Sequence, residues 1–209
     1  MASRSSVPLR ISSTRRATDL LRARLIDTIS SMIRLDGVNL AVVVDPAERA
    51  DLSRFVPSGF DVLATTSPVA SPAAAARTLR TLLGRRFDRV VTVLPGSVPL
   101  PARIVATALA VAANVDLTLG ATPSGRLYLG GARNHESATV FEDVAAPTVD
   151  AVRDAAGRFG LTIGKAEPRR LLGDFSDLGA LRTYVEGNAD LCPEMWHWFS
   201  SRAARMPRR

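Results

Sequence analysis

The feature that most constrains this fold is an alternation between short, β-branched apolar runs and longer segments with helical periodicity. Nearly continuous apolar runs predict strands covered on both faces, at residues 38–44, 88–94 and 115–119. Weaker runs predict strands at residues 60–64 and 161–166. Helical periodicity occupies the intervals, at residues 14–35, 73–85, 102–113 and 148–159. This order predicts a single α/β domain with a mostly parallel sheet and helices on both faces.

Size and composition exclude several classes of protein. A chain of 209 residues fits one domain. Its single cysteine, Cys192, cannot form an internal disulfide. No apolar run has the length of a membrane-spanning helix, and the first residues lack the apolar core of a secretory signal. We therefore expect a cytoplasmic protein with no membrane partner.

The net charge of +7 is concentrated at the two ends of the chain. Residues 1–24 carry a net +5 and residues 199–209 a net +4, so residues 25–198 carry a net −2. Nucleic-acid binding through these basic ends is a minor alternative. We do not expect nucleic acid as the partner, because zinc-finger spacing, an aromatic-rich face and a recognition helix are all missing from the sequence. The division of the chain predicts a flexible basic arm at 1–13, the domain at 14–190, and a C-terminal aromatic and basic helix with a tail at 191–209.

Open α/β sheets bind ligands beyond the carboxyl ends of their strands, so the loops after these strands are the places to search. Asp45 follows the first long apolar run. It is a candidate either to contact a ligand or to cap the next helix.

The loop after the second long run carries a resemblance. Residues 90–104 (VVTVLPGSVPLPARI) resemble a segment of the GT-A-like nucleotide-dependent transferases, in which the aspartate of a G-D-x-P-L pattern holds a divalent metal against a nucleotide diphosphate. Gly96 and Pro99 match the pattern, but Ser97 stands at the aspartate position. A hydroxyl is a neutral and weak ligand for such a metal. We therefore expect no bound divalent metal and no cofactor, with a nucleotide sugar as the small-molecule substrate that the resemblance implies.

The following loop narrows the resemblance. Residues 117–133 (LTLGATPSGRLYLGGAR) are similar to the G-P-A-x-D-G-G-Y-Y-L-I-G-L segment of the bacterial radical-SAM/selenodomain-associated transferases. Gly125 and Tyr128 match this segment, whereas its aspartate falls at Ser124 and its second glycine at Arg126. All four positions are candidates for substrate or nucleotide binding.

Later segments continue the resemblance with further departures. Glu142 and Asp143 fall in the F-E-D-I segment of that family and are candidates for substrate contacts. Residues 171–181 take the place of its closing D-V-D-T-x-x-D-L motif. The two leading aspartates are missing there, with Asp174 as a displaced substitute.

The N-terminus departs most from the family, which opens with a strand and a glycine- and basic-rich nucleotide loop. Here the first strand is short or missing, and Arg15 and Arg16 are left to supply cations for a diphosphate at a helix N-terminus. His135, next to Glu136, is a separate candidate for acid–base chemistry or substrate binding.

The resemblance implies a glycosyltransferase-like protein of a biosynthetic pathway, with a degenerate and metal-independent nucleotide-sugar site. The missing carboxylates leave an alternative open, in which the same fold acts as a non-nucleotide enzyme or as a non-catalytic binding protein. Whether the protein is an enzyme, and which residues are catalytic, stays open. The aromatic segment 195–199 either packs back onto the sheet or forms a homodimer contact.

Overall fold

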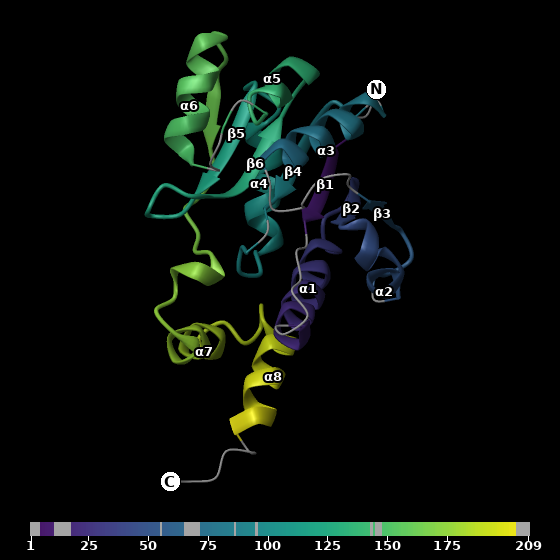
Figure 1. Ribbon diagram of the computed structural model, residues 1–209, viewed down its shortest axis with the longest axis vertical. Coiled ribbons are helices and arrows are strands. Elements are labelled where there is room, and N and C mark those ends of the chain that lie inside the picture. The colour runs from purple at the N-terminus through teal and green to yellow at the C-terminus, as the bar shows by residue number, and fades with distance from the viewer. Residues whose placement is uncertain are drawn as a thin grey trace.

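A seven-stranded sheet forms the centre of the molecule, with helices packed on both of its faces (Figure 1). The computed structural model describes residues 5–10, 18–54, 56–64, 72–85, 87–94, 96–142, 144 and 148–203. Its strands are β1 (Ser5–Arg10), β2 (Val38–Val44), β3 (Phe60–Ala64), β4 (Arg89–Val93), β5 (Leu117–Ala121), β6 (Leu127–Ala132) and β7 (Ile163–Lys165). They lie in the order β3-β2-β1-β4-β6-β5-β7. The sheet is mostly parallel, as predicted, but β6 runs antiparallel to both of its neighbours.

Helices cover the sheet in two layers. The α-helices are α1 (Thr18–Met32), α2 (Arg49–Ser53), α3 (Pro72–Gly84), α4 (Ala102–Val111), α5 (His135–Thr139), α6 (Val149–Arg158), α7 (Leu178–Glu186) and α8 (Pro193–Ala203). Two short 3-10 helices, η1 (Pro46–Glu48) and η2 (Leu172–Asp174), follow β2 and precede α7. Helices α1 and α4 share one hydrophobic cluster with the sheet. Helices α3, α5 and α6 share a second cluster on the other face. Helices on both faces confirm the predicted architecture.

Strand β1 corrects the prediction of a flexible arm over residues 1–13. Residues Ser5–Arg10 form a central strand that pairs in parallel with β2 along its whole length. Pro8 hid this strand, because proline lacks the N–H that a central strand normally uses. The register with β4 indeed includes no pair at Val7 or Pro8, while the pairs at Ser6 and Leu9 remain.

Strand β6 lies in the segment that was interpreted from the sequence as the loop after residues 115–119. All of β6 is buried, and its two glycines weaken the strand signal in the sequence. Packing explains one of them, since a Cβ atom on Gly130 would lie 3.0 Å from the Phe141 ring. Gly130 thus lowers the strand propensity of this segment but allows the Phe141 ring to pack closely against the backbone of β6.

The C-terminal helix α8 docks on other helices and not on the sheet. Met195 and Phe199 are buried in a third hydrophobic cluster with residues of α1 and α7. Asp27 of α1 fixes the start of α8, since its carboxylate accepts hydrogen bonds from the backbone N–H groups of Glu194 (2.9 Å) and Met195 (3.0 Å). Burial raises the pKa of Asp27, and these two hydrogen bonds oppose the shift.

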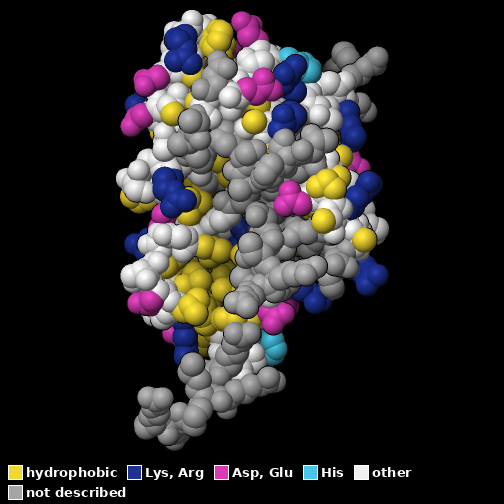
Figure 2. All heavy atoms as spheres, in the orientation of Figure 1, with side chains coloured by type: hydrophobic (Ala, Val, Ile, Leu, Met, Phe, Trp, Pro, Cys, Tyr) yellow, Lys and Arg dark blue, Asp and Glu magenta, His cyan; other side chains and the backbone are white. Residues whose placement is uncertain are grey.

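The third cluster also reaches the surface. Hydrophobic side chains gather in the lower half of the face in Figure 2, over the region where α1, α7 and α8 meet. The half-buried members of the cluster are Leu20, Leu172, Phe175, Tyr184, Leu191, Trp196 and Trp198. A homodimer contact through residues 195–199 stays a prediction.

Within the described ranges, no helix combines the length and the apolar character needed to cross a membrane.

Candidate functional site

Segments from distant parts of the sequence meet where the parallel strands end. Ser97, in the loop after β4, forms an antiparallel bridge with Leu171. The backbone N–H of Leu172 donates to the carbonyl oxygen of Gly96 at 2.7 Å. Gly96 has a φ of +85°, a conformation that favours glycine. This pairing brings η2 and Asp174 to the carboxyl end of β4, the edge at which open α/β sheets bind ligands.

Arg126 joins this site from the start of β6. Its Nη1 lies 3.6 Å from Oδ1 of Asp174, and the two side chains are 53% and 18% exposed. The other oxygen of Asp174, Oδ2, accepts a hydrogen bond from the backbone N–H of Leu171 at 2.7 Å. The turn before Arg126 is tight, because Gly125 has a φ of +80°. Asp174 is therefore held in place, while the guanidinium of Arg126 remains accessible.

A second guanidinium lies beneath the loop. Arg24 of α1 is 4% exposed, and its Nη1 donates to the carbonyl oxygen of Ser97 at 3.0 Å. Its Nε makes no hydrogen bond, and no carboxylate in the described ranges pairs with it. Burial lowers the pKa of Arg24 to about 10, so the group stays charged at neutral pH. A buried cation without a counter-ion costs free energy, which is unusual away from functional sites.

The donors at this site do not fit a divalent cation. Ser97 is 1% exposed, so its hydroxyl is enclosed in the protein. Asp174 supplies a carboxylate, but one oxygen is bonded to Leu171 and the other faces Arg126. Among the residues that the structure describes, no three His, Cys, Asp or Glu side chains gather as metal ligands do. Hard cations need several oxygen ligands, and here a guanidinium lies beside the available carboxylate.

Other candidates from this part of the sequence are buried or engaged locally. Pro99, two residues after Ser97 in the sequence, is also buried. The hydroxyl of Ser124 lies 2.8 Å from that of Thr122, within the β5–β6 turn. Tyr128 is fully buried, and its hydroxyl donates to the carbonyl oxygen of Glu167 at 2.6 Å. Burial raises the pKa of Tyr128 to about 12, so this phenol stays protonated as a structural donor.

Asp45 lies on the same edge of the sheet, at the end of β2. Its backbone occupies the position before η1, but its side chain makes no capping hydrogen bond to that helix. The structure therefore lacks the side-chain hydrogen bond that the capping role of Asp45 requires. A ligand contact through Asp45 stays a prediction.

The structure separates two candidates from the site. His135 begins α5 and lies near Gly84, at the end of α3, on the opposite end of the sheet from Ser97. Its neighbour Asn134 caps α5, because its Oδ1 accepts from the N–H of Ser137 at 2.8 Å. Glu142 forms a surface ion pair with Arg80 at 3.1 Å. Arg15, Arg16 and Asp143 lie outside the described residues.

Sequence reasoning missed Arg24. The sequence does contain a signal for its burial, because Arg24 lies three residues after Leu21 and next to Leu25, on the apolar side of the predicted helix. A charge on an apolar helix face predicts burial with a specific partner. Arg24 was instead counted only as part of the net charge of residues 1–24.

Comparison of the sequence with protein-family models and with curated proteins finds no match. Solved structures do match. A protein of Desulfovibrio desulfuricans assigned as a nucleotide-diphospho-sugar transferase superposes with a TM-score of 0.65, at 18% identity, over 78% of this chain and 80% of that one. The chain has a GT-A-like nucleotide-diphospho-sugar transferase fold.

Two further structures show the same fold. The 4-diphosphocytidyl-2C-methyl-D-erythritol synthase of Anaerococcus prevotii gives a TM-score of 0.55 at 12% identity, over 79% of this chain and 87% of that one. A homologue, from Mycobacterium sp. strain JC1, of the Mycobacterium tuberculosis protein Rv0371c gives 0.58 at 15% identity, over 90% and 98%. The GT-A-like fold therefore extends over most of the chain, and at these identities the likeness concerns the fold alone.

Proposed function

We propose that this protein binds a nucleotide-activated small molecule at the carboxyl ends of β2 and β4, and transfers its glycosyl or nucleotidyl group without a divalent metal. Within the fold class, we place it beside the radical-SAM/selenodomain-associated transferases. Gly125 and Tyr128 of their pattern are present here, and Asp174 stands near the expected carboxylate position.

The observation that carries this proposal is the pair of guanidinium groups at the Ser97–Leu171 bridge. Transfer from a nucleotide diphosphate develops negative charge on the leaving group, which fixed positive charge stabilises. Arg126 is accessible at this edge, and Arg24 lies beneath the backbone of Ser97. In this proposal Arg126 contacts the diphosphate, Arg24 contributes a fixed positive potential, and Asp174 orients Arg126.

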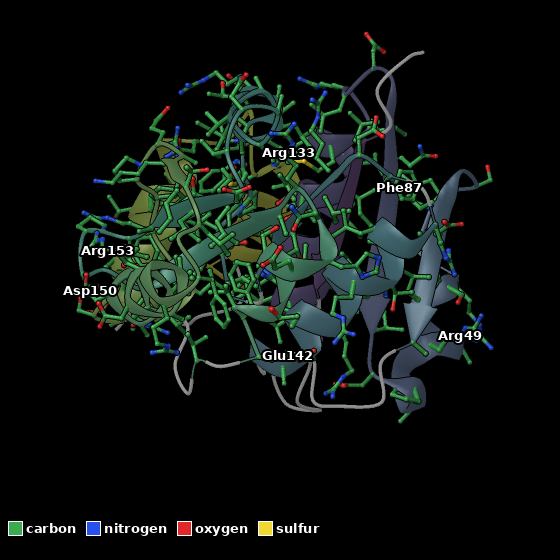
Figure 3. All side chains as sticks on the ribbon, turned by 90° about the horizontal axis from the view of Figure 1, so that it is seen from above. Arg49, Phe87, Arg133, Glu142, Asp150 and Arg153 are labelled. Atoms are coloured by element: carbon green, nitrogen blue, oxygen red, sulfur yellow. The ribbon has the colours of Figure 1, made fainter. Side chains whose placement is uncertain are left out.

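Thermal-shift measurements with UDP-, GDP-, CDP- and dTDP-sugars test the proposal. We expect at least one of them to raise the melting temperature in EDTA, with no further rise when Mn²⁺ replaces EDTA. Arg126→Met should remove most of this stabilisation. Arg133→Met is the matched control, because Arg133 is an exposed arginine at the other end of β6 (Figure 3).

Three outcomes count against all or part of the proposal. Stabilisation that requires Mn²⁺ would mean that the metal and not Arg126 holds the diphosphate. No stabilisation by any nucleotide sugar would favour the alternative, a fold that serves a non-nucleotide ligand. Stabilisation in EDTA without transfer to any acceptor would support the proposed binding site and contradict the proposed transfer reaction.

A further inference from the structure

A cavity lies along the β7 edge of the sheet, away from the Ser97–Leu171 bridge. It has a volume of about 470 Å³ and lies between α6 and the edge formed by β5 and β7. Leu119, Leu161 and Ile163 form much of its apolar wall, and Val149 closes it from α6. This volume is in the range of small-molecule sites. Leu161, Ile163 and Val149 are each only half-buried, so apolar side chains remain open to a ligand.

Charge at this cavity has one sign. Lys165 and Arg153 are the ionisable residues of its lining, and both are basic. Arg153 forms an ion pair with Asp150 at 2.7 Å, one helical turn away on α6. Figure 3 shows this pair at one side of the molecule, well separated from Arg49 beside the other sheet edge. Lys165 is the only lysine of the chain, and its ammonium group forms no ion pair among the described residues.

We infer that this cavity binds an organic anion with an apolar body and a single carboxylate. The apolar body would lie against Leu161 and Ile163, where it is removed from water, and the carboxylate would meet the ammonium group of Lys165. A nucleotide diphosphate fits poorly here, because its several charges and its polar base would face an apolar wall.

The cavity is connected to the proposed transferase site through the chain. Thr122, in its wall, precedes the turn that carries Arg126, and Pro168, also in its wall, precedes the segment that ends at Asp174. The backbone N–H of Arg169 donates to the carbonyl oxygen of Ala121 at 3.1 Å, which holds these two segments together. The inference does not rest on the proposed function, since binding at this cavity is measurable without any transfer reaction.

Calorimetric titration of the full chain provides the test, with decanoate and 2-naphthoate as probes and 1-decanol as the neutral counterpart of decanoate. We expect one saturable site for at least one of the two anions, and weaker binding of 1-decanol than of decanoate. Stronger binding of decanoate or of 2-naphthoate distinguishes an alkyl from an aromatic body.

Substitutions locate the site. Lys165→Met should weaken binding of the anion by about three- to tenfold, while binding of 1-decanol changes by less than about twofold. Arg158→Met is the matched control, because Arg158 is an exposed basic residue at the end of α6, outside the cavity lining. Ile163→Trp fills the cavity and should abolish binding of both probes. Should Ile163→Trp fail to fold, Val149→Phe serves the same purpose from α6.

Three results would overturn the inference: no saturable binding of either anion, equal effects of Lys165→Met and Arg158→Met, or full binding by a folded cavity-filling variant. Absence of anion binding, together with stabilisation by nucleotide sugars, would refute the inference and leave the proposed function intact. Anion binding at the cavity without any stabilisation by nucleotide sugars would support the inference and count against the proposed function.

Discussion

The burial of Arg24 is the most informative single-residue feature of this protein. Desolvation disfavours the charged guanidinium and lowers its pKa from 12.5 to about 10. The free-energy cost of the buried charge is therefore present at every pH below about 10, and it declines only as the pH rises from there toward 12.5. A residue that costs stability at physiological pH is explained most simply by a role in binding.

Replacing Arg24 separates stability from binding. We expect Arg24→Met to leave the free energy of unfolding unchanged or to raise it by about 1 to 2 kcal/mol, because relief of the buried charge outweighs the lost hydrogen bond to Ser97. Nucleotide-sugar binding should weaken in the same variant. Urea unfolding and calorimetric titration measure the two effects, with Arg22→Met, an exposed arginine of α1, as the control. A strong loss of stability with unchanged binding would show that Arg24 is a structural residue.

Cys192 supplies a prediction about reactivity. Burial, together with the charge of Asp27, raises the pKa of its thiol to about 12, and the residue is fully buried. The thiolate is the reactive form, so the native protein should react very slowly with an aromatic disulfide reagent at about pH 8. Unfolding in urea should restore rapid reaction. Fast labelling of the native protein would contradict the buried placement of α8.

At the scale of elements, the attachment of α8 to α1 depends on one carboxylate. Asp27→Ala removes two hydrogen bonds to the start of α8 and should lower the free energy of unfolding by about 2 kcal/mol. The chain's two tryptophans, Trp196 and Trp198, both lie in α8, so their fluorescence emission should shift to longer wavelength. Asp36→Ala, at an exposed position after α1, is the control. Unchanged emission would show that the hydrophobic contacts alone hold α8.

Strand β1 gives a second prediction at this scale. Deleting residues 1–10 removes the strand between β2 and β4 and should abolish cooperative thermal unfolding, as measured by circular dichroism. Deleting residues 1–4, which keeps all of β1, is the control. Cooperative unfolding of the longer deletion would contradict the central position of β1.

Elements with a strong local pattern were predictable from the sequence. Strands β2 and β3 have the predicted bounds, and α3, α4 and α6 differ from prediction by at most a few residues. Two strands were not predicted, for physical reasons. Pro8 lacks the N–H expected in a central strand, so β1 has no clear strand signal. The glycines of β6 have low strand propensity, and Gly130 is required there by close packing against Phe141.

For the candidate site, Gly96, Ser97, Arg126 and Asp174 were proposed from the family resemblance, and the structure brings them together at the Ser97–Leu171 bridge. Arg24 was not proposed, because its place at the candidate site depends on a hydrogen bond to Ser97, which is far away in the sequence.

For the whole molecule, the structure changes the meaning of the basic ends. Arg24, counted with the N-terminal charges, is buried, and Ser5–Arg10 belongs to the sheet. The charge available to a polyanion is thus smaller than the net +7 indicates. We expect no binding of duplex DNA in fluorescence anisotropy at about 0.15 M salt. Tight binding at that salt concentration would show that the ends form a nucleic-acid surface.

The bridge between Ser97 and Leu171 has a consequence for synthesis on the ribosome. All seven strands end by residue 165, so the sheet can form before residues 171–174 emerge. The carboxylate of Asp174 meets Arg126 at the carboxyl end of β4 only when this late segment pairs with the loop after β4. Because such long-range closure comes after local structure, we expect nascent chains that end before residue 171 to be compact and yet unable to recognise a nucleotide.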